Sequence, residues 1–299
     1  MIEILLAIFF ITVLLLFLGS GIWVAISMIG VSSIGMILFT SRPVGDAMAT
    51  TIWGASSSWT LTALPLFVWM GEILFRTKLS ENLFEGLAPW LQKLPGGLIH
   101  VNVVGCALFA AISGSSAATV ATVGKMSIPE LRKRKYPEKI LLGSLAGSGT
   151  LGLLIPPSII LIIYGVTVQE SIAKLFIAGI IPGIMIALIF MGYVIIWSLL
   201  NKNKMPLTDE NFSFLNKLNK SKQLIPVILL ILGVIGSIYT GIATATEAAS
   251  LGVVGALILS YFQKSLNLKT FKESLLGATK TSCMIAFILA GATFLSLAM

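Results

Sequence analysis

The chain has 299 residues, of which 57% are hydrophobic and only 11% are charged, and its mean hydropathy is +0.99. A soluble domain carries roughly 25% charged residues, so this composition excludes an ordinary soluble protein and predicts an all-α polytopic membrane protein. The net charge of +8 does not indicate a nucleic-acid partner, because cationic loops beside membrane helices account for it.

Long apolar segments recur along the chain and predict helices that cross a lipid bilayer. We read the first as a retained helix, because no basic region or clear cleavage site marks a signal peptide. Three amphipathic pieces lie between the spans, at 44–60, 79–94 and 271–282, and the first two are expected to brace the scaffold along the membrane surface. The expected spans are 3–18, 22–40, 61–75, 98–124, 140–165, 172–200, 224–239, 243–262 and 283–299.

The segment 98–124 is apolar but is interrupted near its middle, and neither half is long enough to cross a bilayer alone. Backbone groups freed at such a break need partners other than lipid, so we expect a re-entrant hairpin with its tip near the midplane. The tip hydroxyls, with that of Thr119, are hard oxygen ligands suited to Na⁺, and the start of the second half-helix favours a carboxylate. A packing patch of small residues within a kinked helix is the alternative. The interrupting residues are Ser113, Gly114, Ser115 and Ser116.

A second interruption falls within 140–165, where several glycines precede Pro156 and Pro157. Proline removes a backbone donor and clashes with the preceding turn. We expect a discontinuous helix whose unwound carbonyls, around Gly147–Thr150, face the hairpin tip and complete an ion cage. A proline kink alone is the alternative. The candidate Na⁺ ligands are Ser113, Gly114, Ser115, Ser116, Gly147, Gly149 and Thr150.

Glu247 is an acidic residue near the start of the span 243–262. A carboxylate inside a membrane is costly and is a candidate functional group. The alternative is that a first-turn glutamate compensates the helix dipole. Glu72 and Arg76, by contrast, have the spacing of a surface ion pair on one helix.

The lysines and arginines predict the orientation in the membrane. With the N-terminus outside, all of the 20 basic residues except Arg42 and Lys174 fall on one side, which is a strong positive-inside bias. We therefore expect a periplasmic or extracellular N-terminus, a cytoplasmic polar linker at 201–222, and a hairpin that opens to the cytoplasm.

Two pairs of segments resemble each other across the linker, namely 20–38 with 240–259 and 53–71 with 276–291. Their offsets are similar and the two halves start on opposite sides, which is typical of an inverted-topology repeat. We expect a second repeat to begin in 223–299 and to stop before its own hairpin. The first repeat, 1–200, is expected to hold scaffold and arm helices at 1–95, the hairpin at 96–126, the discontinuous helix at 139–165 and a helix at 171–200.

The run GGLIHVNVVGCALFAAISGSSAATVATVGKMSIPEL and the later LIPPSIILIIYG resemble the large membrane subunit of tripartite ATP-independent periplasmic (TRAP) transporters. The resemblance extends over essentially all of 1–299. It implies no enzyme but a Na⁺-coupled permease in the bacterial inner membrane, in which a mobile domain moves like an elevator past a rigid scaffold. It also implies a small four-helix membrane subunit, a soluble periplasmic binding protein and a small anionic substrate, such as a C4-dicarboxylate or sialic acid, with no organic cofactor.

The resemblance further assigns residues of this chain to the substrate site. The expected substrate contacts are Ser115, Ser116, Thr119, Pro156 and Pro157.

The sequence departs from the family pattern in one respect. Members of the family contain a second hairpin and a second discontinuous helix that this sequence lacks, so we expect the chain as written not to complete alternating access. An elevator symporter working without a binding protein and a nonfunctional truncated fragment are alternatives. A serine protease using His100 is disfavoured, since His100 and Ser113 are about 20 Å apart along one helix.

Overall fold

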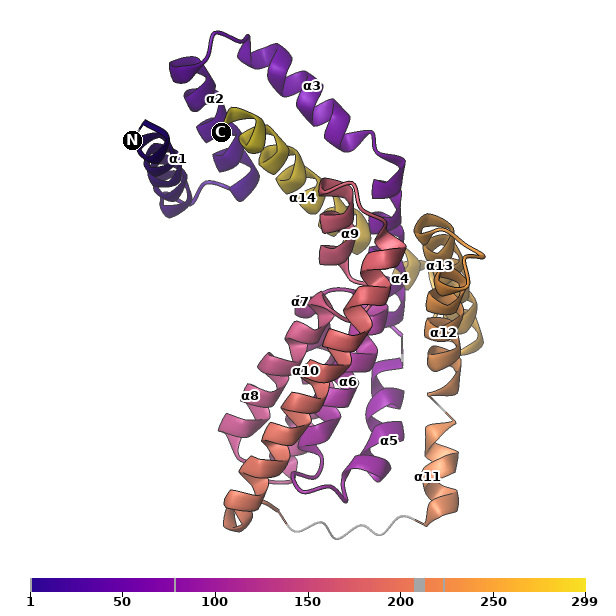
Figure 1. The fold of residues 1–299 in the computed structure, drawn as a ribbon. Helices are drawn as coiled ribbons and strands as arrows, with labels where there is room; N and C mark the ends of the chain where they lie inside the picture. Colours follow the sequence, from indigo (N-terminus) through magenta and orange to yellow (C-terminus); the bar gives the residue numbers. More distant parts are fainter. Residues whose placement is uncertain (1, 78, 207–212, 223) are drawn as a thin grey trace. The chain divides into compact units, whose positions relative to one another are not determined.

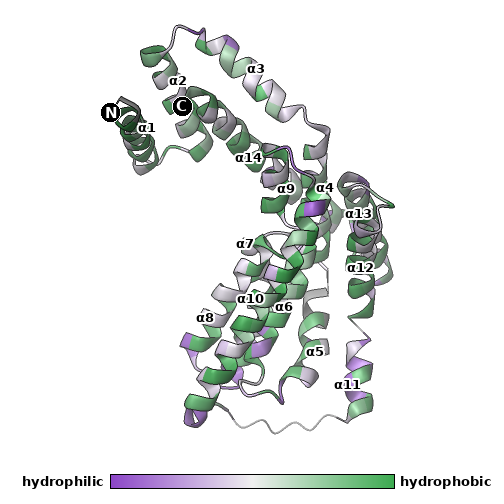
Figure 2. Ribbon diagram, in the orientation of Figure 1, coloured by the Kyte–Doolittle hydropathy of each residue, from purple (hydrophilic) through white to green (hydrophobic). Residues whose placement is uncertain are grey.

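The computed structural model describes residues 2–77, 79–206, 213–222 and 224–299, and every regular element within these ranges is helical. Within these ranges, three helices are long and apolar enough to cross a membrane, and up to five spans result if each of two bent helix pairs counts as one. Hydrophobic residues make up much of the length of most helices (Figure 2). The all-α membrane class is therefore confirmed. Lys78 and residues 207–212 of the expected linker lie outside the described residues.

The chain divides into two compact units, residues 1–61 with 279–299 and residues 62–278. The first unit contains α1 (Ile2–Gly19), α2 (Val24–Phe39), α3 (Val44–Ser56) and the C-terminal part of α14 (Leu268–Ala298). The second contains α4 (Ala63–Phe75), α5 (Leu79–Leu91), α6 (Ile99–Ser113), α7 (Ser116–Lys133), α8 (Glu138–Gly149), α9 (Ile159–Thr167), α10 (Ile172–Leu200), α11 (Phe214–Ser221), α12 (Ile225–Tyr239), α13 (Ala245–Phe262) and the start of α14 (Figure 1).

Small residues bring the helices of the first unit close together. The ring of Phe10 on α1 occupies the place that a side chain at Gly35 of α2 would need. In the same way, a Cβ on Gly291 of α14 would lie 2.9 Å from the carbonyl oxygen of Ala25. Without a hydrophobic effect between helices in lipid, such close packing is a main source of association.

In the second unit, α6 is the central helix, and α7, α8 and α10 pack around it. Its buried Val103 and Ala110 form a cluster with Leu151, against which Ile155 and Phe190 also pack. On the other side of the unit, α4 packs along both α6 and α13. The hairpin formed by α6 and α7 is therefore held within protein on several sides.

One expected boundary is wrong, because 271–282 and 283–299 are not separate elements. They form the single helix α14, which begins at Leu268 and ends at Ala298. No proline falls inside this segment, and its glycines cost a helix only about 1 kcal/mol each. The change from polar to apolar composition therefore occurs along one continuous helix.

The two repeat segments that begin with a Gly-Ile pair have the same local structure. Gly21 has a φ of +81° and Gly241 a φ of +72°, and α2 and α13 begin a few residues later. The other pair differs, because 53–71 includes the break between α3 and α4, whereas 276–291 lies within continuous α14. The inverted repeat as a whole stays a prediction.

Tyr136 closes the base of the hairpin from the turn between α7 and α8. Its hydroxyl accepts a hydrogen bond from the backbone N–H of Leu98 at 3.1 Å. Burial raises the pKa of Tyr136, although the Leu98 hydrogen bond and the charge of Arg134 oppose the rise. The tyrosine is therefore neutral at physiological pH and satisfies a buried backbone donor.

We expect Tyr136→Phe to lower the free energy of unfolding by about 1–3 kcal/mol, because the Leu98 N–H loses its acceptor. The folded-state pKa is raised, so the contribution of Tyr136 is complete below the ordinary tyrosine pKa of about 10 and is lost as the pH rises through the folded-state value. Unfolding in mixed detergent micelles, followed by circular dichroism from pH 7 to pH 11, measures both effects. Tyr164→Phe is the matched control, since Tyr164 is exposed; equal losses in the two variants would contradict the prediction.

Candidate functional site

The hairpin tip connects α6 to α7 through two residues. Ser113 ends α6, Gly114 has a left-handed φ of +58°, and Ser115 is the N-cap of α7. A residue with a side chain costs about 1–2 kcal/mol in the left-handed conformation, so glycine suits this position. The interruption expected at 113–116 is present as a tight turn between two packed helices.

The serine and threonine hydroxyls at the tip form hydrogen bonds with one another or with the backbone, with one exception. Ser113 Oγ shares a hydrogen bond with Thr119 Oγ1 at 3.0 Å and accepts one from the Ser115 N–H at 3.3 Å. Ser115 Oγ accepts from the Ala118 N–H at 3.4 Å and so caps α7. Ser116 Oγ is buried, and among the described residues it has no hydrogen-bond partner. A hydroxyl in this state is a candidate ligand for an ion.

The tip is in backbone contact with the break in the discontinuous helix. α8 continues as a short 3₁₀ turn, η2 (Thr150–Leu153), and the chain then leaves the helix until α9 begins at Ile159. The Ile159 N–H donates a hydrogen bond to the carbonyl oxygen of Gly114 at 3.2 Å. A Cβ on Gly114 would lie 2.7 Å from the carbonyl oxygen of Pro157. The two interruptions predicted from the sequence therefore meet.

The break lies later in the chain than the expected Gly147–Thr150. α8 stays helical through Gly149, and the Gly147 carbonyl accepts hydrogen bonds from the Thr150 N–H and hydroxyl, the latter at 2.7 Å. A Cβ on Gly147 would lie 3.3 Å from the Phe190 ring of α10, so Gly147 faces α10 rather than the tip. Glycines weaken a packed helix only mildly, whereas consecutive prolines remove two donors, and the helix breaks at the prolines.

Two other glycines bring α8 and η2 against the start of α7. A Cβ on Gly152 would lie 2.8 Å from the Ser116 nitrogen and 2.9 Å from the Ser115 carbonyl carbon. A Cβ on Gly149 would overlap the Val120 side chain. The η2 turn is therefore the part of the discontinuous helix that adjoins the unpaired Ser116 hydroxyl.

A third element, α4, backs the tip from the other side. A Cβ on Gly71 would lie 2.9 Å from Ser113 Cα and 3.5 Å from the Ile112 carbonyl oxygen. Backbone atoms cannot move aside as the end of a flexible side chain can, so this approach requires glycine. Sequence reasoning missed Gly71, because nothing in the local pattern of α4 marks it.

The residues expected to contact substrate do not all gather in one place. Ser115, Ser116 and Thr119 lie at the tip, and Pro157 lies against it. Pro156 packs instead toward α10, where its Cγ lies 3.7 Å from the position of a Cβ on Gly179.

Glu247 lies at the start of α13, away from these contacts. Its carboxylate accepts hydrogen bonds from the Thr244 N–H and hydroxyl, each at 2.8 Å, and the two residues form a capping box. The structure thus has the arrangement of the capping alternative, which stabilises the first turn of a helix.

His100 and Ser113 occupy opposite ends of α6, as the spacing predicts. His100 Nε2 lies 2.8 Å from the carbonyl oxygen of Pro95, so the ring caps the turn before α6. A hydrogen-bonded histidine–serine pair at the tip is not formed.

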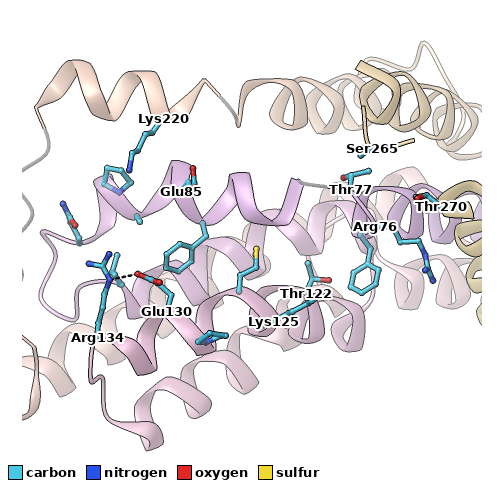
Figure 3. A pocket seen from close by; sticks show the side chains of 18 of the residues that line it. Arg76, Thr77, Glu85, Thr122, Lys125, Glu130, Arg134, Lys220, Ser265 and Thr270 are labelled. Carbon is cyan, nitrogen blue, oxygen red and sulfur yellow. Dashed lines mark hydrogen bonds and ion pairs between the residues drawn. The ribbon is translucent and has the colours of Figure 1, made fainter. Parts of the chain in front are cut away.

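A cavity of about 970 Å³ opens beside α7 (Figure 3). Its α7 wall continues the face that carries Thr119 and includes Thr122, Lys125 and Pro129. These positions follow the spacing of one helix face. This spacing could have been used to predict the α7 wall of the cavity from the sequence.

Charged groups border this cavity, and most of them are paired. Arg76 donates to Glu72 at 3.2 Å and to Glu273 at 2.9 Å. The pair with Glu72 confirms the spacing argument, while the pair with Glu273 joins α4 to α14. Lys125 is exposed on the cavity wall, and it forms no ion pair with any residue that the structure describes.

Comparison with known proteins identifies relatives of this chain. The family model described as "Tripartite ATP-independent periplasmic transporter, DctM component" matches residues 10–299. A C4-dicarboxylate TRAP transporter large permease protein of Pseudomonas aeruginosa is 33% identical over 88% of this chain and 61% of its own length. A sialic acid TRAP transporter large permease protein of Vibrio cholerae is 33% identical over 92% of this chain and 64% of its own length.

An ectoine/5-hydroxyectoine TRAP transporter large permease protein of Ruegeria pomeroyi is similar too, with 32% identity over 95% of this chain and 65% of its own length. The chain therefore spans less than two thirds of the length of these relatives. These relatives are named for three different substrates, so the similarity identifies the permease family and not one substrate.

Proposed function

Because this chain belongs to the DctM family of tripartite ATP-independent periplasmic transporters, we propose that it is a permease subunit for Na⁺-coupled import of an organic acid. The family consists of transporter subunits, not enzymes. The proposed substrate is of the C4-dicarboxylate or sialic acid type, by analogy with the relatives named for these acids. A periplasmic binding protein would deliver it, and a small four-helix membrane subunit would complete the assembly.

The contact between the hairpin tip and the broken helix is the observation that carries this proposal. Two interrupted helices place backbone and hydroxyl oxygens next to the start of α7, as ion-coupled transporters require at their binding sites. The buried Ser116 hydroxyl, together with Ser115 and the adjoining η2 turn, supplies the oxygen donors that a hard cation prefers. Bound Na⁺ would add positive charge beside the N-terminus of α7, which already favours a carboxylate.

In the proposed elevator movement, the module from α6 to α10 carries the site past α4. The close approach of Gly71 to Ser113 would provide a surface without side chains along which the tip can travel. The distribution of basic residues supports an inner-membrane orientation with the N-terminus in the periplasm. On this orientation, the cavity beside Lys125 lies toward the cytoplasm and offers the anion a cationic exit.

Uptake into proteoliposomes tests the function. The chain as written and a version extended with the C-terminal part of a DctM relative are each reconstituted with the small subunit, and labelled organic acids are added outside with a Na⁺ or a choline gradient, with and without the binding protein. Uptake that needs both Na⁺ and the binding protein is expected of the extended version, and no uptake is expected of the chain as written. Uptake by the extended version without the binding protein would favour a simpler elevator symporter, and no uptake by either would favour a nonfunctional fragment. The extended version with the small subunit is the reconstituted system used for the variants.

We expect Ser116→Ala to raise the Na⁺ concentration for half-maximal uptake about tenfold, which corresponds to about 1.4 kcal/mol of lost binding. The reason is that the hydroxyl has no protein partner to lose, so its removal acts on the ion. The measurement is a Na⁺ titration of uptake by the reconstituted system.

Ser127→Ala is the matched control for this change. Ser127 lies on the same helix and is also buried with an unpaired hydroxyl, but it is about three turns from the tip. An unchanged Na⁺ titration is expected for it. Equal shifts in the two variants would remove Ser116 from the ion site.

A further inference from the structure

The short helix α11 is amphipathic, and its apolar side is not covered by the described part of the chain. Phe214, Leu215 and Leu218 are 67%, 74% and 49% exposed. At about 100° per residue these positions fall on one side of a helix. Asn216 and Lys220 fall on the opposite side, and Figure 2 shows the two kinds of residue alternating along α11.

Contacts with α5 hold α11 by one edge and leave that apolar side open. The indole N–H of Trp90 donates a hydrogen bond to Ser221 Oγ at 2.6 Å. The Trp90 ring meets the Phe214 ring edge to face, with centroids 6.1 Å apart, and Lys217 Nζ lies 5.5 Å from the ring centroid. Trp90 is itself 43% exposed, so it extends the apolar surface beyond α11.

The position of α11 along the chain keeps it close to the membrane. α11 ends at Ser221 and α12 begins at Ile225, so the connection can span at most about 14 Å. α12 is strongly apolar, and large side chains such as Ile225 and Leu229 are exposed along it. A helix anchored so near the end of a membrane helix has its open apolar side within reach of the bilayer.

The charges on the other sides of α11 indicate which surface its apolar side fits. Lys220 and Lys222 follow Lys217 within six residues, and α11 contains no acidic residue. A helix with aromatic and leucine side chains on one face and lysines beside it inserts into the headgroup region of anionic membranes. Anionic lipids attract such lysines in addition to the burial of apolar area.

We propose that α11 is an interfacial helix that lies on the anionic lipid leaflet, with Leu215 and Leu218 in the acyl boundary and Lys220 and Lys222 among the headgroups. Through Trp90 the same helix fixes α5 to the membrane surface. The surface formed by α11 and Trp90 is thus a lipid-binding site in the connection between the two halves of the chain.

Spin labels on opposite sides of α11 test this proposal in the full chain. A nitroxide is attached to Leu218→Cys or, as the matched control on the other side, to Asn216→Cys, after the exposed Cys283 is replaced by serine. The chain is reconstituted in vesicles of phosphatidylcholine with about 30% phosphatidylglycerol. The readout is the ratio of relaxation by apolar oxygen to relaxation by a water-soluble nickel chelate.

We expect this ratio to be at least about threefold higher at position 218 than at 216, because oxygen concentrates in lipid and the chelate stays in water. The difference should shrink in pure phosphatidylcholine and in the variant Lys220→Gln/Lys222→Gln. Equal chelate access at both positions would place α11 in water and overturn the proposal. Protection of position 218 from both reagents would mean that protein covers the face, which also overturns it. A label at Leu215→Cys repeats the test if the first variant does not fold.

Discussion

Gly114→Val is expected to abolish Na⁺-dependent uptake and to lower the free energy of unfolding by about 2–5 kcal/mol. The left-handed conformation at Gly114, with a φ of +58°, costs about 1–2 kcal/mol for a residue with a side chain. The new Cβ would also lie 2.7 Å from the Pro157 carbonyl oxygen and 3.2 Å from the Ile159 nitrogen, and overpacking of this kind costs about 1–3 kcal/mol. Either the turn or the contact with the broken helix must give way.

Unfolding in mixed micelles and uptake by the reconstituted system measure the two effects. Gly143→Ala is the control, because Gly143 lies inside α8 with nothing within 4 Å of its would-be Cβ. Alanine there is expected to leave uptake unchanged and to stabilise the helix by up to about 1 kcal/mol. A Gly114→Val variant with normal uptake would show that the tip contact is not needed for transport.

Gly71→Ala is expected to reverse the usual effect of placing alanine in a helix. Alanine is more favourable than glycine by about 1 kcal/mol in a helix interior. At Gly71, however, the added methyl group would lie 2.9 Å from Ser113 Cα, and separating α4 from the tip costs about 1–3 kcal/mol. We expect net destabilisation and, if α4 is the surface past which the tip moves, at least a tenfold loss of uptake.

For the control variant Gly233→Ala we expect no loss of stability. Gly233 lies inside α12, and nothing lies within 4 Å of its would-be Cβ, so alanine should stabilise the protein or leave it unchanged. Thermal unfolding in detergent and initial uptake rates are measured for both variants. Equal stabilisation by both alanines would show that α4 and the tip separate without cost.

Much of the helical architecture follows from local properties of the chain. The apolar segments 172–200 and 243–262 predict α10 and α13 to within two residues, because a long, predominantly apolar run has no other stable form in lipid. Pro182 lies inside α10 without ending it. The break at 113–116 is equally local, since serine caps a helix and Gly114 permits a turn. The pairing of Glu72 with Arg76 needs only the spacing of a helix.

The contacts between helices could be identified only from the folded structure. Gly147 and Gly152 look alike in the sequence, yet Gly147 faces Phe190 while Gly152 faces Ser116. Helix orientation decides between them, and packing against α10 and α7 sets that orientation. Pro156 and Pro157 are divided between α10 and the tip for the same reason.

By itself, the sequence determined that this is a helical membrane protein with two interrupted helices, because hydropathy, capping and proline act over a few neighbouring residues. Only the tertiary structure decided that the two interruptions touch through Gly114 and Ile159, that α4 backs the tip at Gly71, and that the Ser116 hydroxyl has no partner in the described part of the chain. These contacts join residues far apart in the chain, and their existence depends on van der Waals distances that no local pattern encodes.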